Sequence, residues 1–319
     1  MTRWLEQAVS KNRRGTFSSY ESRIRLYVNP IVGKVRLGAL TREHVEQVEA
    51  YARTRGLSPS SIQLLRVIFS TALNAAIKWE RPGARNVVRL TAPAKIEKRT
   101  YKVLSPDDAR RLLDEAAEGP FASAYATMLY CGLRVGEALA LRWADIDLER
   151  RTIHIEHSLT RGDRGKGAEL GPTKTRDSKR TFDLSSIAAA TLKEQRLSQL
   201  RQQAAAGERG FPWLNDWGLV FTMPLGEPVN PSTLLWDFGT RLKAAGLPPM
   251  RLHDLRHSCA TLLHEAGVDW KEISHLMGHS KVSITQDLYA HMTPLLRQRT
   301  AEAMDQMFSR VSGSPNTGN

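Results

Sequence analysis

The 319-residue sequence contains little cysteine and no long hydrophobic run. Its two cysteines, Cys131 and Cys259, stand among apolar residues at spacings that suit no zinc site, so we expect reduced thiols in a hydrophobic core. No stretch near eighteen residues is continuously apolar, and no secretory signal opens the chain. These two absences favour a soluble protein of the cytoplasm.

Acidic residues are scarce in the first third of the chain. Residues 1–104 contain 20 Lys and Arg but only 7 Asp and Glu, whereas residues 105–319 contain 26 of each. The whole net charge of +13 therefore belongs to the first third. This surplus predicts a surface for a polyanion, and nucleic acid fits better than a membrane because the helical patterns lack an aromatic-anchored amphipathic face. The imbalance disfavours the alternative, a helical domain with an ordinary solvated charged face.

Apolar spacing predicts a helical N-terminal domain over residues 1–90. Three helices are expected in it: one with Thr16 as its N-cap that Asn29-Pro30 and Gly33 end, one from Thr41 to Gly56, and a longer one that carries Ile62 through Ala76. Residues 91–104 show no periodicity and carry four Lys and Arg, so we expect an exposed basic linker there.

A second domain is expected over residues 105–293, because Ser105, Pro106 and two acids form a helix start. Alternation over residues 152–157 predicts a strand whose partner is 180–184, across the glycine-rich stretch 162–171. Helical patterns occupy most of the rest. The predicted fold class is therefore mainly α with a small antiparallel β-sheet.

Residues able to break a phosphodiester bond without a metal occur in three stretches. These read Cys131-Gly132-Leu133-Arg134-Val135-Gly136-Glu137, then His253-Asp254-Leu255-Arg256-His257, and finally Met277-Gly278-His279-Ser280 followed by Leu288-Tyr289-Ala290-His291. The arginines are permanent cations whose planar donor groups match a phosphate. The histidines can move protons near neutral pH, and a tyrosine hydroxyl can attack phosphorus and hold the phosphoryl group.

These stretches, in this order, resemble the tyrosine recombinases, the family of phage integrases. The resemblance implies a helical core-binding domain followed by a mixed α/β catalytic domain. It also implies roles for particular residues: Arg134 and Arg256 clamp the scissile phosphate, His253 and His279 donate hydrogen bonds or protons to it, Tyr289 is the nucleophile, and Glu137 and His257 support them. Alternatives remain open for two of these groups. Arg134 and Glu137 alone read as a surface ion pair, and His253 and His257 with Asp254 read as a metal site. Six of the nine histidines fall between 253 and 291, but no His-Glu-x-x-His pattern and no paired carboxylates accompany them.

The stretch from Lys174 to Arg180 resembles the family's Lys-Thr-x-x-Ser-x-Arg hairpin, whose lysine protonates the leaving 5′ oxygen. The resemblance therefore implies Lys174 as general acid in preference to Lys166 or Lys179. The alternative is a solvated basic hairpin that touches the DNA backbone.

Beyond Tyr289, residues 294–311 carry an apolar stripe at helical spacing, and residues 312–319 are expected to be disordered. The stripe is formed by Leu296, Ala303, Met304, Met307, Phe308 and Val311. Either this helix folds back on its own domain or it docks on a neighbouring subunit. The resemblance favours the exchange between subunits.

The resemblance implies a site-specific DNA recombinase that cuts and rejoins DNA through a 3′-phosphotyrosine, with no cofactor, metal or ATP, to integrate or excise a phage or mobile element in a bacterial host cell. The implied partners are double-stranded DNA with core-type attachment sites, further copies in a homotetramer on synapsed DNA, and a directionality factor as a candidate; no membrane is implied. A type IB topoisomerase is disfavoured by the integrase-like stretches and the compact core-binding domain. A catalytically silent DNA-binding protein of the same fold is disfavoured because all six reactive positions are filled.

Overall fold

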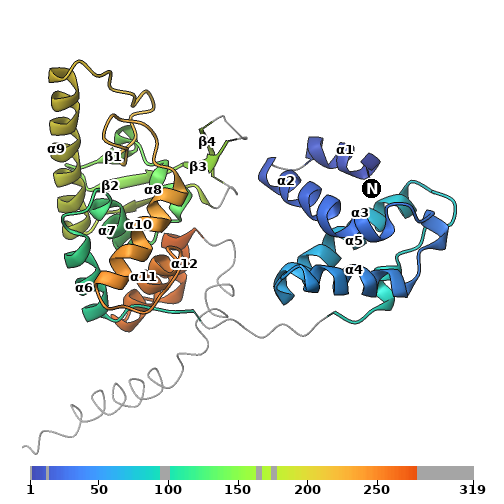
Figure 1. The fold of residues 1–319 in the computed structure, drawn as a ribbon. Helices are drawn as coiled ribbons and strands as arrows, with labels where there is room; N and C mark the ends of the chain where they lie inside the picture. Colours follow the sequence, from blue (N-terminus) through green and yellow to red (C-terminus); the bar gives the residue numbers. More distant parts are fainter. Residues whose placement is uncertain (1, 12–13, 94–100, 163–166, 174–177, 279–319) are drawn as a thin grey trace, which may run out of the picture. The chain divides into compact units, whose positions relative to one another are not determined.

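The chain forms two compact units, Met1–Arg99 and Thr100–Asn319 (Figure 1). The computed structural model describes residues 2–11, 14–93, 101–162, 167–173 and 178–278. Three of the expected site residues, Lys174, His279 and Tyr289, lie outside the described residues, as do the expected C-terminal helix 294–311 and the tail 312–319.

The N-terminal unit is helical. Its elements are α1 (Thr2–Lys11), α2 (Arg14–Arg23), a π-helix (Ile24–Val28), α3 (Asn29–Val32), a 3-10 turn (Leu37–Ala39), α4 (Arg42–Thr54), α5 (Pro59–Lys78) and a second 3-10 turn (Val87–Leu90). Thr41 is the N-cap of α4, and Ser58 is the N-cap of α5 and accepts a hydrogen bond from the backbone N–H of Ser61. The two helices expected around these caps are therefore confirmed.

The first expected helix ends at Gly33, as expected, but Asn29-Pro30 does not end it. Helical backbone runs from Arg14 through the π-helix and α3 to Val32, so Thr16 is inside it and not its N-cap. Pro30 is accommodated because the π-turn changes the hydrogen-bond register just before it, with the N–H of Asn29 bonded to the carbonyl of Ile24. A local stop signal was overridden by the buried side chains of Ile24, Val28 and Val32, which the continued helix keeps in the core.

α5 is long and apolar enough, by length and composition, to cross a membrane. Its apolar face is instead the centre of the N-terminal core, where Ile62, Leu65 and Phe69 are almost fully buried. The same helix carries the buried Arg66, which pairs with Glu49 and donates to backbone and side-chain oxygens of Thr91. Core packing therefore accounts for the hydropathy of α5.

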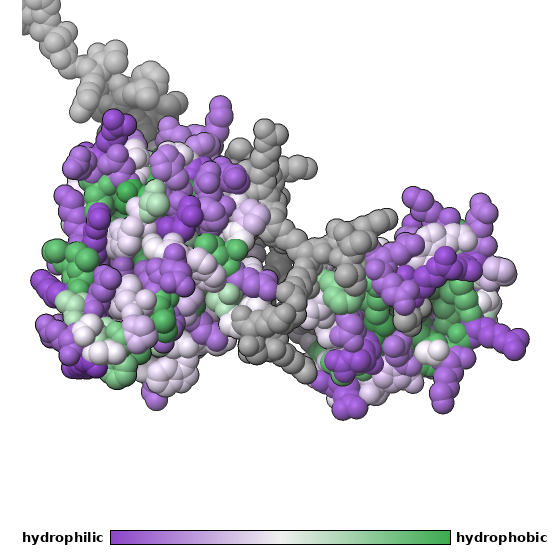
Figure 2. Space-filling view, turned by 90° about the horizontal axis from the view of Figure 1, so that it is seen from above, coloured by the Kyte–Doolittle hydropathy of each residue, from purple (hydrophilic) through white to green (hydrophobic). Residues whose placement is uncertain are grey.

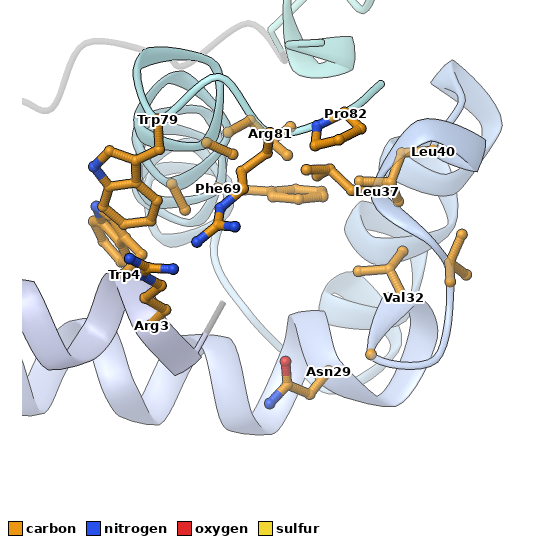
Figure 3. Close-up of a pocket in the computed structure, with 15 residues that line it drawn as sticks. Arg3, Trp4, Asn29, Val32, Leu37, Leu40, Phe69, Trp79, Arg81 and Pro82 are labelled. Atoms are coloured by element: carbon orange, nitrogen blue, oxygen red, sulfur yellow. The ribbon is translucent and has the colours of Figure 1, made fainter. Parts of the chain in front are cut away.

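A hollow of about 630 Å³ opens into this unit beside α1, α3 and α5 (Figure 3). Trp4, Phe69 and Trp79 line it together with the cationic side chains of Arg3 and Arg81. The guanidinium of Arg3 lies 5.8 Å from the centre of the Trp79 ring, within range of a cation–π contact.

The second unit combines helices with two small antiparallel sheets. Its helices are α6 (Pro106–Ala116), α7 (Ala122–Cys131), α8 (Val135–Leu139), α9 (Ser186–Glu208), α10 (Pro231–Ala244), α11 (Asp254–Glu265) and α12 (Trp270–Met277), with a 3-10 turn at Trp143–Asp145. Figure 1 shows α9 along one side of the unit, with α6 below its lower end and α10, α11 and α12 further from it. α7 packs against both α9 and α11, so it forms the centre of the core.

One sheet has the order β1 (Ile146–Asp147), β2 (Thr152–Ile155) and β5 (Arg180–Asp183). The expected pairing of residues 152–157 with 180–184 is confirmed, with Ile153 opposite Phe182. A second sheet pairs β3 (His157–Arg161) with β4 (Ala168–Pro172). All of β4 except Pro172 lies inside the stretch expected to be a glycine-rich connection. The short sequence of β4 shows no clear alternation of apolar and polar residues. It is extended because it pairs with β3.

The stretch 91–104 is not an exposed linker at either end. Thr91 is buried in the N-terminal unit, where Arg66 binds it. Leu104 is buried in the second unit, and its N–H donates to Oγ of Ser258 at 2.9 Å. The expectation was wrong for these ends because their partners lie far away in the sequence, where no local pattern reveals them.

The outer surface of each unit is mainly hydrophilic on the face seen in Figure 2, with smaller hydrophobic patches. The most exposed large apolar side chain among the described residues is Trp236 on α10, at 72%. Both cysteines are free and buried, as expected, and burial raises the pKa of the Cys131 and Cys259 thiols to about 12.

Candidate active site

Three chain segments meet at the candidate site: the turn between α7 and α8, the start of α11, and the end of α12. Two glycines with left-handed backbone let them approach. Gly132 ends α7 at φ 60°, and a Cβ there would lie 2.5 Å from Cε of Met277. Gly278 ends α12 at φ 60°. Both glycines are thus favoured by their left-handed backbone conformation.

Arg134 stands at the N-cap of α8 and is bound to Glu137 one turn later. Nη1 of Arg134 donates to Oε1 of Glu137 at 2.6 Å, and the backbone N–H of Arg134 donates to Oε2 at 3.1 Å. Nη2 of Arg134 donates to the carbonyl of Gly278 at 3.4 Å. The Arg134 side chain remains 35% exposed whereas that of Glu137 is 3% exposed. The carboxylate is therefore an internal support for a guanidinium that still reaches the surface, and the surface ion-pair alternative is excluded.

Arg256, on α11, is among the most deeply buried side chains of the described chain, at 2% exposed. Its Nη1 donates to the carbonyl of Gly132 at 2.6 Å, and its Nη2 donates to the carbonyl of Met277. Burial, followed by the nearby charge of Arg134, lowers the pKa of Arg256 to about 9. The group therefore stays cationic at neutral pH, close to the cation of Arg134.

His253 and His257 lie one turn apart at the start of α11. Their ring centres are 5.0 Å apart at an edge-to-face angle of 89°. Burial and the charges of Arg256 and Arg134 lower the pKa of His253. Burial and then His253 lower the pKa of His257 to about 4, so His257 is neutral near pH 7. The ring of His257 also packs against that of Tyr101, with the two ring centres 4.5 Å apart.

Asp254 is used by an ion pair and not by a metal cluster. Its carboxylate accepts from Nη2 of Arg251 at 2.6 Å and from the backbone N–H of Arg251 at 2.9 Å. Within the part of the chain that the structure describes, no group of three or more His, Cys, Asp or Glu side chains is arranged to hold a metal ion. The hypothesis of a site formed by His253, His257 and Asp254 therefore receives no support.

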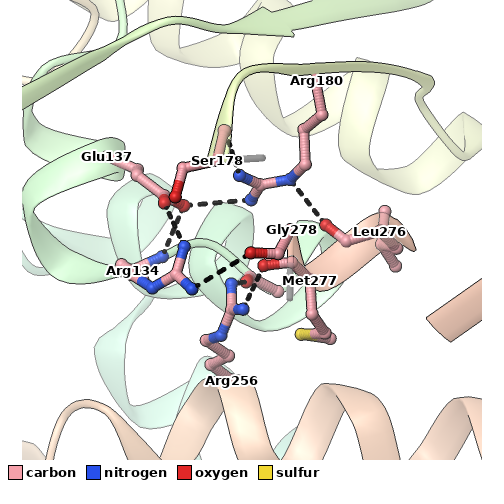
Figure 4. Close-up of polar contacts among 9 residues, drawn as sticks. Arg134, Glu137, Ser178, Arg180, Arg256, Leu276, Met277 and Gly278 are labelled. Atoms are coloured by element: carbon pink, nitrogen blue, oxygen red, sulfur yellow. Dashed lines mark hydrogen bonds and ion pairs between the residues drawn. The ribbon is translucent and has the colours of Figure 1, made fainter. Parts of the chain in front are cut away.

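Arg180 belongs to the same site, although we expected no role for it from the sequence. It lies on β5 with its side chain 2% exposed, and its Nη2 donates to Oε2 of Glu137 at 3.0 Å. Its Nε donates to the carbonyl of Leu276 at 2.6 Å and its Nη1 to that of Ser178 at 3.0 Å. Figure 4 shows Glu137 between the guanidinium groups of Arg134 and Arg180. The only signal in the sequence was the last position of the Lys-Thr-x-x-Ser-x-Arg resemblance.

The electrostatics of this cluster are those of an anion site. Burial alone would raise the pKa of the Glu137 carboxyl, but Arg180, Arg134 and Arg256 together hold it below its ordinary value. One buried negative charge is thus set among three guanidinium groups. The excess positive charge, with an exposed part of Arg134, can attract and orient a phosphate.

The structure brings together five of the expected residues: Arg134, Glu137, His253, Arg256 and His257. Lys174, His279 and Tyr289 lie outside the described residues. Two of these three, Lys174 and His279, directly follow a residue that the structure describes. Thr173, before Lys174, is buried, and Gly278, before His279, accepts the hydrogen bond from Arg134.

The sequence matches known proteins over most of its length. A model of the phage integrase family matches residues 102–295. A XerC-like tyrosine recombinase of Caldanaerobacter subterraneus is 31% identical over 97% of this chain and 82% of its own length. An integrase of Streptomyces ambofaciens is 30% identical over 96% of this chain and 79% of its own length.

Solved structures share the fold at lower identity. The integrase of the Tn1549 transposon, in complex with transposon right end DNA, superposes with a TM-score of 0.77 at 20% identity, covering 93% of this chain and 97% of that chain. A lambda integrase tetramer bound to a Holliday junction has a TM-score of 0.61 at 21% identity, over 88% and 76% of the two chains.

Proposed function

The chain belongs to the phage integrase family and is a tyrosine recombinase that acts on DNA, and from this premise we propose that it cuts and rejoins DNA through a 3′-phosphotyrosine on Tyr289. The observation that supports this proposal best is the convergence of Arg134 and Arg256, from separate helices, beside the end of α12. The chain continues from there into His279 and Tyr289.

In the proposed reaction the side chains supply the charge that a metal ion supplies elsewhere. Arg134 and Arg256, with hydrogen bonds from His253 and His279, offset the charge that builds on the scissile phosphate. The hydroxyl oxygen of Tyr289 attacks phosphorus and loses its proton, and the bond from phosphorus to the 5′ oxygen breaks. Lys174 donates a proton to that leaving oxygen. A 5′ hydroxyl from a second duplex then attacks the phosphotyrosine and reverses the step. The reaction therefore needs neither a metal ion nor ATP.

Glu137 and His257 would act through the other residues. The Glu137 carboxylate orients Arg134 by two hydrogen bonds. Neutral His257 meets His253 edge to face and is itself covered by Tyr101. Such buried neighbours hold a reacting group in one geometry, which is where much of the rate of a phosphoryl transfer originates.

The N-terminal unit would supply most of the DNA affinity. Its surplus of cations is largely exposed, and several lie on the loops and helix ends of the unit. They include Lys34, Arg36, Arg53, Lys78, Arg81, Arg85 and Arg89. Contacts of this kind to phosphates bind DNA without reading its sequence and weaken as salt rises. We infer double-stranded DNA with core-type attachment sites as the substrate.

The wider role that we propose is the integration and excision of a phage or mobile element in a bacterial host cell, by four copies on two synapsed duplexes. The relatives named integrase and the tetrameric lambda structure on a Holliday junction support this assignment by analogy. A directionality factor remains a candidate partner.

The test starts from DNA that the protein selects from a random duplex library. A nicked duplex with the selected site is incubated with the protein in EDTA, and the products are separated under denaturing conditions. We expect a covalent protein–DNA adduct with the wild type and none with Tyr289→Phe. An adduct that persists in Tyr289→Phe would show that another residue is the nucleophile. Relaxation of supercoils without any strand exchange would instead favour a topoisomerase.

A further inference from the structure

Arg180 is a buried cation for which the proposed reaction has no use. Its side chain is 2% exposed, and the proposed cationic roles at the phosphate are already filled by Arg134 and Arg256. A charge buried this deeply costs free energy unless each donor finds an acceptor. Each of the three guanidinium nitrogens of Arg180 has an acceptor, and two of these acceptors lie on other segments of the chain, which is more than a single ion pair would need.

Two of the three acceptors belong to α8 and to the end of α12 at the proposed site, and the third lies two residues before Arg180 in the sequence. Nη2 donates to Glu137, the residue that holds Arg134. Nε donates to the carbonyl of Leu276, two residues before Gly278 at the end of α12. Nη1 donates to the carbonyl of Ser178, at the start of the chain that leads from residues 174–177 into β5. The fork of one guanidinium therefore ties together segments that are remote in sequence.

We propose that Arg180 is a positioning residue of the recombination site, which holds α8, the end of α12 and the start of β5 in one register. This inference deepens the proposed function and rests on it. The planar fork matters as well as the charge, because an ammonium group cannot direct three bonds into these fixed directions. Arg180 itself touches neither the phosphate nor the nucleophile in this proposal.

The test compares Arg180→Lys and Arg180→Met with a matched control, Arg142→Lys. Arg142 is also bound to a carboxylate within the second unit, through Nε and Nη2 to Asp145 at 3.0 and 2.7 Å, and Asp145 is not one of the site residues. For each protein we would measure the unfolding midpoint, the affinity for the selected duplex, and the single-turnover rate of adduct formation on the nicked duplex across a pH series.

We expect all three variants to bind the duplex about as well as the wild type, since the binding surface lies mainly in the first unit. Adduct formation should slow by about 10²-fold in Arg180→Met, the cost of a small misplacement of reacting groups. Arg180→Lys should recover part of this loss by restoring a charge beside Glu137, and yet stay slower than Arg142→Lys. In Arg180→Met the acidic limb of the rate profile should move to higher pH, because the Glu137 carboxyl loses the cation that lowers its pKa most.

If Arg180→Lys forms the adduct at the rate of Arg142→Lys at every pH, the inference is overturned, even if Arg180→Met does not fold. If the wild type forms no adduct at all, the proposed function fails and this inference fails with it. A loss of duplex affinity that accounts for the whole slowing would also overturn the positioning role. The two proposals are thereby separated by the behaviour of the wild type.

Discussion

Glu137 accepts two hydrogen bonds from Arg134, one from its guanidinium at 2.6 Å and one from its backbone N–H at 3.1 Å. A pair spaced by three residues on a surface helix would contribute little to stability. Here the carboxylate is 3% exposed and also binds the buried Arg180, so its loss leaves a cation without a counter-charge. The pair is therefore a structural element of the site.

The first prediction is that Glu137→Gln lowers the free energy of unfolding by about 3 kcal/mol at pH 7, because it removes one partner of a buried ion pair. The pKa of Glu137 is lowered in the folded protein. Its contribution is thus fully present above its unfolded pKa, about 4.3, and is lost as the pH falls through the folded value. The difference between wild type and variant in urea unfolding should therefore shrink below about pH 4. Asp145→Asn, which removes the partner of Arg142, is the control. A difference in unfolding free energy between wild type and Glu137→Gln that is equal at all pH values would contradict the role assigned to the Glu137 carboxylate.

The second prediction concerns His257, whose pKa of about 4 lies below its ordinary value. The unfolded chain takes up a proton near pH 6.5 while the folded protein does not, so stability should fall between about pH 6.5 and pH 4, by about 3 kcal/mol in total. His257→Gln should remove this part of the slope and leave the pH dependence of stability above pH 7 unchanged. Ring NMR signals of His257 that titrate near pH 6.5 in the folded protein would contradict the prediction.

The third prediction addresses Lys174, which lies outside the described residues. Because Lys174 is the proposed general acid, Lys174→Ala should slow cleavage of a normal phosphodiester by about 10²–10⁴-fold. A substrate with sulfur in place of the bridging 5′ oxygen has a better leaving group and should need the lysine far less. Equal defects on both substrates would assign Lys174 to DNA binding and direct attention to Lys179 or Lys166.

The fourth prediction is that residues 295–319 serve contacts between subunits. Deleting them should leave the binding of one half-site nearly intact, because the net positive charge lies in residues 1–104. Cooperative occupancy of two half-sites and recombination should both be lost. Gel-shift titrations on one and two half-sites measure this directly, and a truncated protein that still occupies both sites cooperatively would rule out subunit exchange.

Local signals were sufficient for much of the fold. Ser105 and Thr41 stand at the starts of the helices that they predicted, since a cap needs only its neighbouring N–H groups. The pairing of β2 with β5 followed from alternation in residues 152–157 and from the position of 180–184 across the glycine-rich stretch. The helix break at Asn29-Pro30 was wrong, because burial of Ile24, Val28 and Val32 outweighed a local stop signal.

Residue identities and their order, by themselves, determined the family, the mainly α fold and the choice of Arg134, His253 and Arg256, because these depend on chemistry and spacing along the chain. Only the tertiary structure decided that Glu137 is a buried support and that Arg180 shares it. It also decided that Leu104, expected in an exposed linker, packs beside Ser258. These contacts join segments remote in sequence, and the burial that gives a charge its cost and its pKa shift exists only once those segments have packed together.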